Sequence, residues 1–173
     1  REFVELLRRY QNMHALVVGP DFALGKGRKG NAEALKELGN ILDFSVEVVP
    51  PATVNGEVVS STAIRKALAQ GDVAKASRFL GRHFTIAGVV AKGDERGRTL
   101  GFPTANIVPE QGQALPADGV YAAQAHLGEA MHPAVVNIGL RPTFGSEERL
   151  VEAHLLDFSG NLYGQELRVE LVE

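Results

Sequence analysis

The sequence predicts an α/β domain over residues 1–81 followed by an antiparallel β-barrel domain over residues 82–173. In the first part, apolar residues recur at helical spacing between short apolar runs. After Gly81, strand-like runs follow one another without a convincing helix between them. The charge balance changes at the same place, from 11 Lys and Arg against 9 Asp and Glu to 7 against 12. These observations place the expected domain boundary at about residue 82.

Helix and strand signals alternate through the first domain. The spacing of Phe3, Leu6, Leu7 and Tyr10 predicts an amphipathic helix at the start. The elements expected next are a strand at Ala15–Val18, a helix at Ala32–Leu38 between Asn31 and Gly39, a strand at Phe44–Val49, a helix through Ile64 and Leu68 capped by Ser61 or Thr62, and a helix at Val73–Leu80 between Asp72 and Gly81. This order is typical of an α/β layer.

Strand-like runs separated by turns rich in Gly and Pro make up the second domain. They are Phe84–Val90, Val120–His126, Ala134–Asn137, Leu150–Leu156 and Leu167–Val172. Several strands with few helices predict an antiparallel sheet or a small barrel.

Composition narrows the class of protein. The 173 residues contain no Cys, which excludes disulfides and thiolate metal sites and fits a reducing cytoplasm. No apolar run approaches the roughly 20 residues of a membrane helix. A net charge of −3 with 6% aromatic residues argues against a general nucleic-acid binder. We therefore expect a cytoplasmic protein with neither a membrane nor a nucleic acid as partner, and find no signal for an oligomeric state.

The segment Gly25–Gly30 matches the pattern G-x-G-x-x-G but not its usual setting. Asp21–Leu24 separates it from the turn after the first strand, and Gly27 follows Lys26 where a phosphate-binding P-loop needs Ser or Thr. A basic surface loop and a phosphate-contacting loop both remain open.

A helix should begin at the segment Ser60–Arg65. Hydroxyls and free amides at a helix N-terminus can bind an anion, and Arg65 would add a charge one turn in. Helix capping by Ser or Thr is an equally weighted alternative.

Polar residues of the second domain form two further candidate sets. In Lys92–Asn106, glycines permit turns and two Arg residues can face phosphates, while Thr104 and Asn106 project to one side of an extended segment. Their oxygens would suit Mg²⁺, although ordinary turn residues fit the spacing as well. Glu152 and His154 share one strand face, which fits the solvated outer face of an antiparallel sheet.

Several strings along the chain match one family in order. They are Val17–Phe22 with Gly25–Arg28, Ser60–Arg65, Leu80–Phe84, Gly97–Asn106, Asn137–Thr143, Val151–His154 and Leu162–Gly164. The most specific pair among them is Pro-Thr-Ala-Asn ending at Asn106, followed downstream by Glu-x-His starting at Glu152. Through these strings, nearly the whole chain resembles the bacterial bifunctional riboflavin kinase/FMN adenylyltransferase (FAD synthetase) family.

The resemblance implies a Rossmann-like nucleotidyltransferase domain followed by a Greek-key β-barrel that phosphorylates riboflavin. It implies that Thr104 and Asn106 hold Mg²⁺ and ATP, that Glu152 is the catalytic carboxylate, and that the loop containing Gly93, Arg96 and Arg98 covers the nucleotide. Asn137 and Arg141 match a segment near that active site. In the first domain, the resemblance implies that Asp21 and Phe22 approach the flavin and that Ser60, Ser61, Thr62 and Arg65 contact phosphates.

The implied activity is phosphorylation of riboflavin to FMN with ATP, and in the full-length protein adenylylation of FMN to FAD. The family's His-x-Gly-His segment has no counterpart in this sequence, so residues 1–81 are expected to be the C-terminal part of the adenylyltransferase domain. The barrel domain is likewise expected to lack its C-terminal helix. The alternative from a different class is a non-catalytic flavin- or nucleotide-binding fragment.

Overall fold

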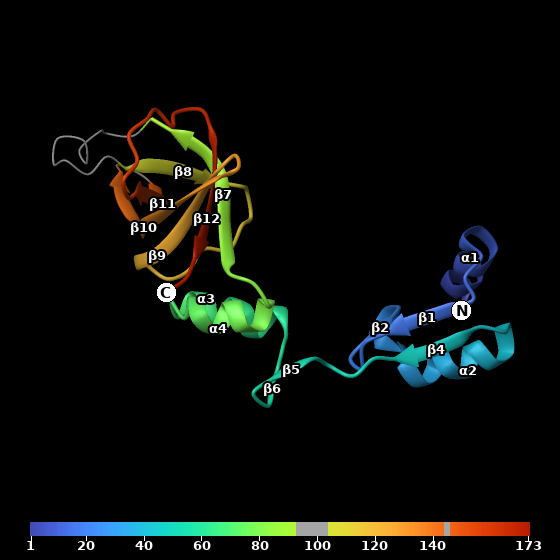
Figure 1. The fold of residues 1–173 in the computed structure, drawn as a ribbon. Coiled ribbons are helices and arrows are strands. Elements are labelled where there is room, and N and C mark those ends of the chain that lie inside the picture. The colour runs from blue at the N-terminus through green and yellow to red at the C-terminus, as the bar shows by residue number, and fades with distance from the viewer. Residues whose placement is uncertain (93–103, 144–145) are drawn as a thin grey trace. The chain divides into compact units, whose positions relative to one another are not determined.

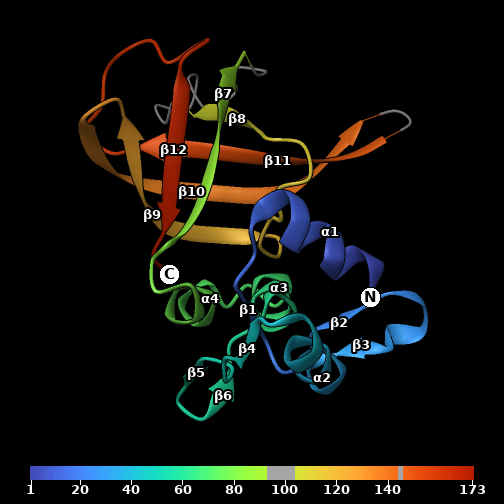
Figure 2. The same ribbon diagram turned by 90° about the vertical axis from the view of Figure 1, so that its right-hand side faces the viewer.

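The computed structural model describes residues 1–92, 104–143 and 146–173 (Figures 1 and 2). The chain forms two compact units, Arg1–Val58 and Val59–Glu173. This division lies before two helices that the sequence assigned to the first domain, whose expected end was residue 81. The assignment of residues 59–81 to the first domain therefore stays a prediction.

The first unit contains a small α/β layer. Helix α1 (Glu2–Gln11) precedes strand β1 (Ala15–Val18), which pairs in parallel with β4 (Ser45–Val48), and α2 (Ala32–Leu42) connects the two strands. Short antiparallel pairs are formed by β2 (Ala23–Leu24) with β3 (Gly30–Asn31), around a 3₁₀ turn at Lys26–Arg28, and by β5 (Thr53–Val54) with β6 (Glu57–Val58). Val4, Leu35 and Phe44 form the buried core of this unit.

The sequence suggested that helix α2 ends at Gly39, but the helix continues beyond this residue. It begins after Asn31, whose side chain accepts a hydrogen bond from Ala34 N, and continues to Leu42 before Asp43 adopts a left-handed conformation. Gly39 is buried, and a Cβ at this position would lie 2.4 Å from the carbonyl oxygen of Phe44. Glycine is needed here for close packing inside the helix and not to end it.

The second unit opens with two helices, α3 (Ser61–Ala69) and α4 (Val73–Leu80). Ser60 caps α3, one residue before the expected Ser61 or Thr62, and accepts a hydrogen bond from Ala63 N at 3.1 Å. Asp72 caps α4 as predicted, accepting from Lys75 N at 2.8 Å. No helix in the described ranges has the length and apolar character needed to cross a membrane.

Six antiparallel strands close into a barrel, which confirms the fold class expected for the second domain (Figure 1). They are β7 (Phe84–Ala91), β8 (Ala105–Pro109), β9 (Gly119–Leu127), β10 (Ala130–Thr143), β11 (Ser146–Leu155) and β12 (Glu166–Leu171). Around the barrel their order is β10, β11, β8, β7, β12 and β9. Strand β8 was not predicted as a separate strand, and β10 extends well beyond the expected Ala134–Asn137.

The barrel interior is filled by the alternate, inward-facing residues of its strands. Ile86, Val136, Val151 and Leu167 are fully or almost fully buried. At one end of the barrel, α3 and α4 add Leu68, Val73 and Ala76 to the same core cluster (Figure 2). Burying one Val or Leu side chain contributes about 1.5–3 kcal/mol, so these helices contribute substantially to the stability of the barrel unit.

Candidate functional site

A row of polar side chains crosses three neighbouring strands of the barrel. Asn106 of β8 is the register partner of Glu152 of β11, which is in turn the partner of Asn137 of β10. Asn137 Nδ2 donates a hydrogen bond to Glu152 Oε2 at 3.3 Å. Since Val151 and Ala153 are buried on either side of Glu152, strand alternation places the carboxylate on the outer face. We call Asn106, Glu152 and Asn137 the polar row.

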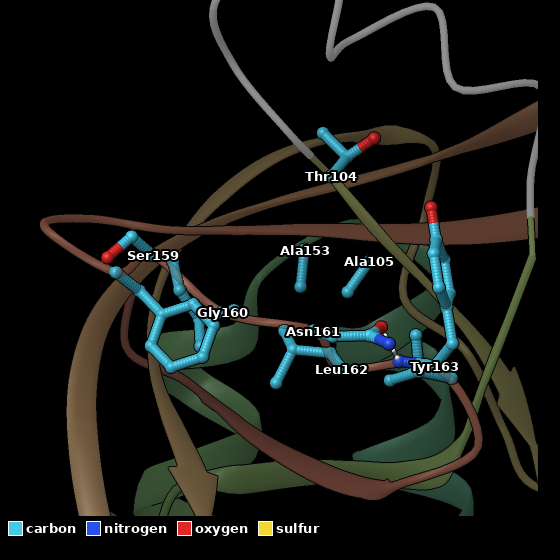
Figure 3. Close-up of a pocket in the computed structure, with 11 residues that line it drawn as sticks. Thr104, Ala105, Ala153, Ser159, Gly160, Asn161, Leu162 and Tyr163 are labelled. Atoms are coloured by element: carbon cyan, nitrogen blue, oxygen red, sulfur yellow. Dashed lines mark hydrogen bonds between the residues drawn. The ribbon is translucent and has the colours of Figure 1, made fainter.

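A cavity of about 520 Å³ lies on the inner face of the strands whose outer face carries the polar row (Figure 3). It is lined by inward-facing residues of β7, β8 and β11, including Ala105 and Ala153, which are the chain neighbours of Asn106 and Glu152. Thr104 lines the same cavity immediately before β8 begins. Phe158–Tyr163, which follows β11, contributes the remaining lining residues. The cavity is therefore apolar on one side and bordered by hydroxyl and amide groups on another.

The donor set of this region suits a nucleotide that carries Mg²⁺ with it. Thr104 offers a hydroxyl, Asn106 an amide oxygen and Glu152 a carboxylate, all of them oxygen ligands that Mg²⁺ accepts. Among the described residues there is no group of three or more His, Cys, Asp or Glu that could hold a metal alone. The residues thus fit an ion that retains waters and phosphate oxygens. The cavity that Thr104 lines has room for a planar ring system.

The structure brings together only part of the predicted kinase site. Asn106, Asn137 and Glu152 lie side by side on β8, β10 and β11, and Thr104 immediately precedes β8. Gly93, Arg96 and Arg98 lie outside the described residues. Arg141 lies on β10, in register with Glu148.

The predicted residues of the first domain lie in both compact units. Asp21 is exposed, and its carbonyl oxygen accepts a hydrogen bond from Arg28 Nη2 at 2.6 Å, while Phe22 packs against the core of the first unit. In the second unit, Ser60 is the helix cap, and the exposed Ser61, Thr62 and Arg65 lie in the first turns of α3. The capping alternative for Ser60 is therefore observed, while a phosphate contact remains a prediction.

The cavity segment Phe158–Tyr163 was not among the predicted site residues. Asn161 Oδ1 accepts a hydrogen bond from Tyr163 N at 3.0 Å, and the carbonyl oxygen of Asn161 accepts one from Gln165 Nε2 at 2.6 Å. These bonds order a turn that presents its side chains to the cavity (Figure 3). A signal was present in the sequence, because Leu162–Gly164 is one of the family-like strings, but spacing alone gave it no role.

Comparison with known sequences identifies both parts of the chain. The sequence model described as riboflavin kinase matches residues 80–173, and that described as FAD synthetase matches residues 1–63. The chain is 43% identical over 168 residues to the bifunctional riboflavin kinase/FMN adenylyltransferase of Escherichia coli K12, which covers 96% of the chain and 53% of that relative. The corresponding protein of Bacillus subtilis 168 is 36% identical over 175 residues, covering 98% and 54%.

A solved structure shares the same arrangement of elements. The crystal structure described as a macrolide-efflux protein from Streptococcus pneumoniae superposes with a TM-score of 0.87 at 34% identity, covering 98% of this chain and 55% of the other. The chain spans about half the length of the curated relatives it matches. With more than half of its residues matched by the riboflavin kinase sequence model, the chain belongs to the riboflavin kinase family.

Proposed function

We propose that the barrel unit transfers the γ-phosphoryl group of ATP to the terminal ribityl hydroxyl of riboflavin, giving FMN and ADP. The observation that carries this proposal is the polar row, in which Asn137 donates a hydrogen bond to Glu152, on strands whose inner face lines the cavity. A carboxylate and an amide on neighbouring strands, with the Thr104 hydroxyl at the border of the cavity, suit a reaction between a nucleotide and an alcohol.

In this proposal Glu152 is the general base. A primary hydroxyl is a weak nucleophile, and a carboxylate within hydrogen-bond reach can orient it and accept its proton as the new O–P bond forms. The bond between the γ-phosphorus and the bridging oxygen breaks at the same time, and ADP leaves. The hydrogen bond from Asn137 Nδ2 holds one carboxylate oxygen and leaves the other available for the substrate hydroxyl.

Thr104 and Asn106 would hold the phosphates of ATP where β8 begins, and the cavity, which Thr104 lines, would take the base. Bound Mg²⁺ would neutralise phosphate charge as the phosphoryl group is transferred. The loop with Gly93, Arg96 and Arg98 would cover the nucleotide. Arg141, in the segment that also holds Asn137, is proposed to lie near the same site.

The second activity belongs to the same proposal for the whole protein. Adenylylation of FMN to FAD, with ATP as co-substrate, would use Asp21, Phe22 and the segment Ser60–Arg65. The relatives that carry both activities in their names match this chain over about half of their length. The cytoplasm, where ATP is available, is the proposed location.

The proposal is tested by incubating the protein, as encoded, with riboflavin and ATP in the presence of Mg²⁺ and separating the flavins by chromatography. We expect FMN and ADP to form in equal amounts, and the reaction to stop when EDTA removes the metal. Stoichiometric binding of riboflavin or ATP without ADP production would contradict the kinase proposal and favour the non-catalytic binding alternative.

A further inference from the structure

Strand β11 has a one-sided edge just before the polar row. It runs from Ser146 to Leu155, but β8 pairs with it only at Val151–Ala153. Continuing this register would place Pro109, the last residue of β8, opposite Arg149. Proline has no N–H to donate to a strand ladder, which explains why the pairing does not extend further. In the described part of the chain, β11 therefore gains its second strand neighbour only one residue before Glu152.

At this position the side chain of Arg149 makes hydrogen bonds to the connection between β8 and β9. Its Nη2 donates to the carbonyl oxygen of Pro116 at 2.5 Å and to Asp118 Oδ1 at 2.5 Å, and its Nε donates to the same carboxylate oxygen at 3.1 Å. Pro116 and Asp118 belong to the connection between β8 and β9. A planar guanidinium that makes several such bonds is held in one orientation more firmly than a lysine ammonium. We call Arg149, Pro116 and Asp118 the Arg149 latch.

The segment to which Arg149 binds is itself fixed. Pro116 is fully buried. Ala117 N donates to the carbonyl oxygen of Leu68 in α3 at 2.8 Å, and the Tyr121 hydroxyl donates to the carbonyl oxygen of Ala117 at 2.7 Å. Consecutive residues of the segment are thus bonded to α3, β9 and β11. The latch therefore joins the free edge of β11 to a rigid part of the barrel unit.

We propose that Arg149 is a positioning residue for Glu152 in the phosphoryl transfer, a role that rests on the function proposed above. Arg149 lies three positions before Glu152 on an extended strand, roughly 10 Å along β11, so Arg149 acts through the backbone and not on the substrate. A general base must lie within hydrogen-bond distance of its proton, and a shift of about 1 Å can cost up to about a hundredfold in rate. By fixing the edge where β11 enters the barrel, the latch would fix the position from which Glu152 projects.

The test compares Arg149→Ala with Arg149→Lys, Asp118→Asn and a matched control in the protein as encoded. Arg168→Ala on β12 is the control, because Arg168 is an exposed arginine whose Nη2 is 3.9 Å from Glu170. For Arg149→Ala we expect kcat to fall about tenfold or more while KM for MgATP stays within about twofold. Arg149→Lys should recover part of kcat, since a lysine can keep one ion pair but not the bond to Pro116.

Amide hydrogen exchange provides a readout that does not depend on activity. Faster exchange at residues 150–153 in Arg149→Ala, but not in Arg168→Ala, would support the latch even if the wild-type protein makes no FMN and the kinase proposal fails. Asp118→Asn combined with Arg149→Ala should lower kcat no further than Arg149→Ala alone, because both substitutions break the same contact between Arg149 and Asp118.

The proposal would be overturned if kcat of Arg149→Ala stayed within twofold of wild type. It would also be overturned if the double variant lost kcat by the product of the losses in Arg149→Ala and Asp118→Asn. Loss of folding in both Arg149→Ala and Asp118→Asn would also overturn it, because Arg149 would then be required for folding and not for position.

Discussion

Replacing Gly88 by Ala should separate the two strands on which the nucleotide site depends. Gly88 of β7 is the register partner of Pro109 in β8 and of Leu167 in β12. A Cβ built at this position would lie 1.9 Å from the carbonyl oxygen of Val108 and 2.6 Å from its carbonyl carbon. Because these atoms belong to the backbone, the clash cannot be relieved by turning a side chain, and β8 must move away.

The size of the effect follows from that geometry. Reaching ordinary van der Waals distance requires the strands to separate by about 1.5 Å, which breaks ladder hydrogen bonds around Gly88. Losing two or three such bonds, at about 1 kcal/mol each, lowers the free energy of unfolding by roughly 3 kcal/mol. For a unit of this size the thermal midpoint should fall by about 10 °C. Asn106 pairs with Ala91 in the same ladder, so MgADP affinity should fall as well.

The assay is thermal unfolding followed by circular dichroism, with and without MgADP. Gly139→Ala is the matched control, because Gly139 also lies in a barrel strand but its added Cβ would meet no atom within 4 Å. This control should stay within about 0.5 kcal/mol of wild type. A Gly88→Ala protein that unfolds at the wild-type temperature would refute the close-approach argument.

Two further substitutions test the nucleotide site and the hydrogen bond of Tyr121. Asn106→Ala should weaken MgADP binding, measured by calorimetry, and turnover together; unchanged binding would return Asn106 to a structural role. Burial raises the pKa of Tyr121 above its ordinary value of 10.0. The charge of Arg149 lowers this pKa and the charge of Asp118 raises it, but burial is the largest effect. The neutral phenol is therefore favoured in the fold, and stability should decline as the pH rises above 10. Tyr121→Phe removes this hydrogen bond, so its free energy of unfolding at neutral pH should be about 1 kcal/mol lower than that of the wild type. Above pH 10 its free energy of unfolding, measured by denaturant titration, should fall less steeply with pH than that of the wild type. An equally steep fall would contradict this expectation.

Much of the fold could be predicted because its signals are local. Asn31 and Asp72 cap helices as their residue types suggest, and alternation along the strands marks which side chains are buried. The predicted helix ends were wrong where one residue type can serve two purposes. Gly39 resembles a helix stop but allows close packing, and any of the three residues in the run Ser60–Thr62 could cap a helix.

The candidate site could be predicted only in part, because it depends on pairing between distant strands. Alternation put Glu152 on the outer face of a strand, and spacing put Asn106 on the same side as Thr104. Neither pattern indicates that β8 lies beside β11, or that Glu152 and Asn106 are register partners. Strand β8 has only five residues and ends at Pro109, so its own strand signal is weak. Arg149 was not singled out, since its role depends on a contact 31 residues away in the sequence.

The most direct test of the account is the rate of FMN formation by Glu152→Gln. Glutamine keeps the size of the side chain and can still bind Asn137, but it removes the negative charge and the basicity. We expect kcat to fall at least about a hundredfold, the usual contribution of a general base, with thermal stability and MgADP affinity nearly unchanged. A Glu152→Gln protein that forms FMN at close to the wild-type rate would contradict the assignment of Glu152 as the base.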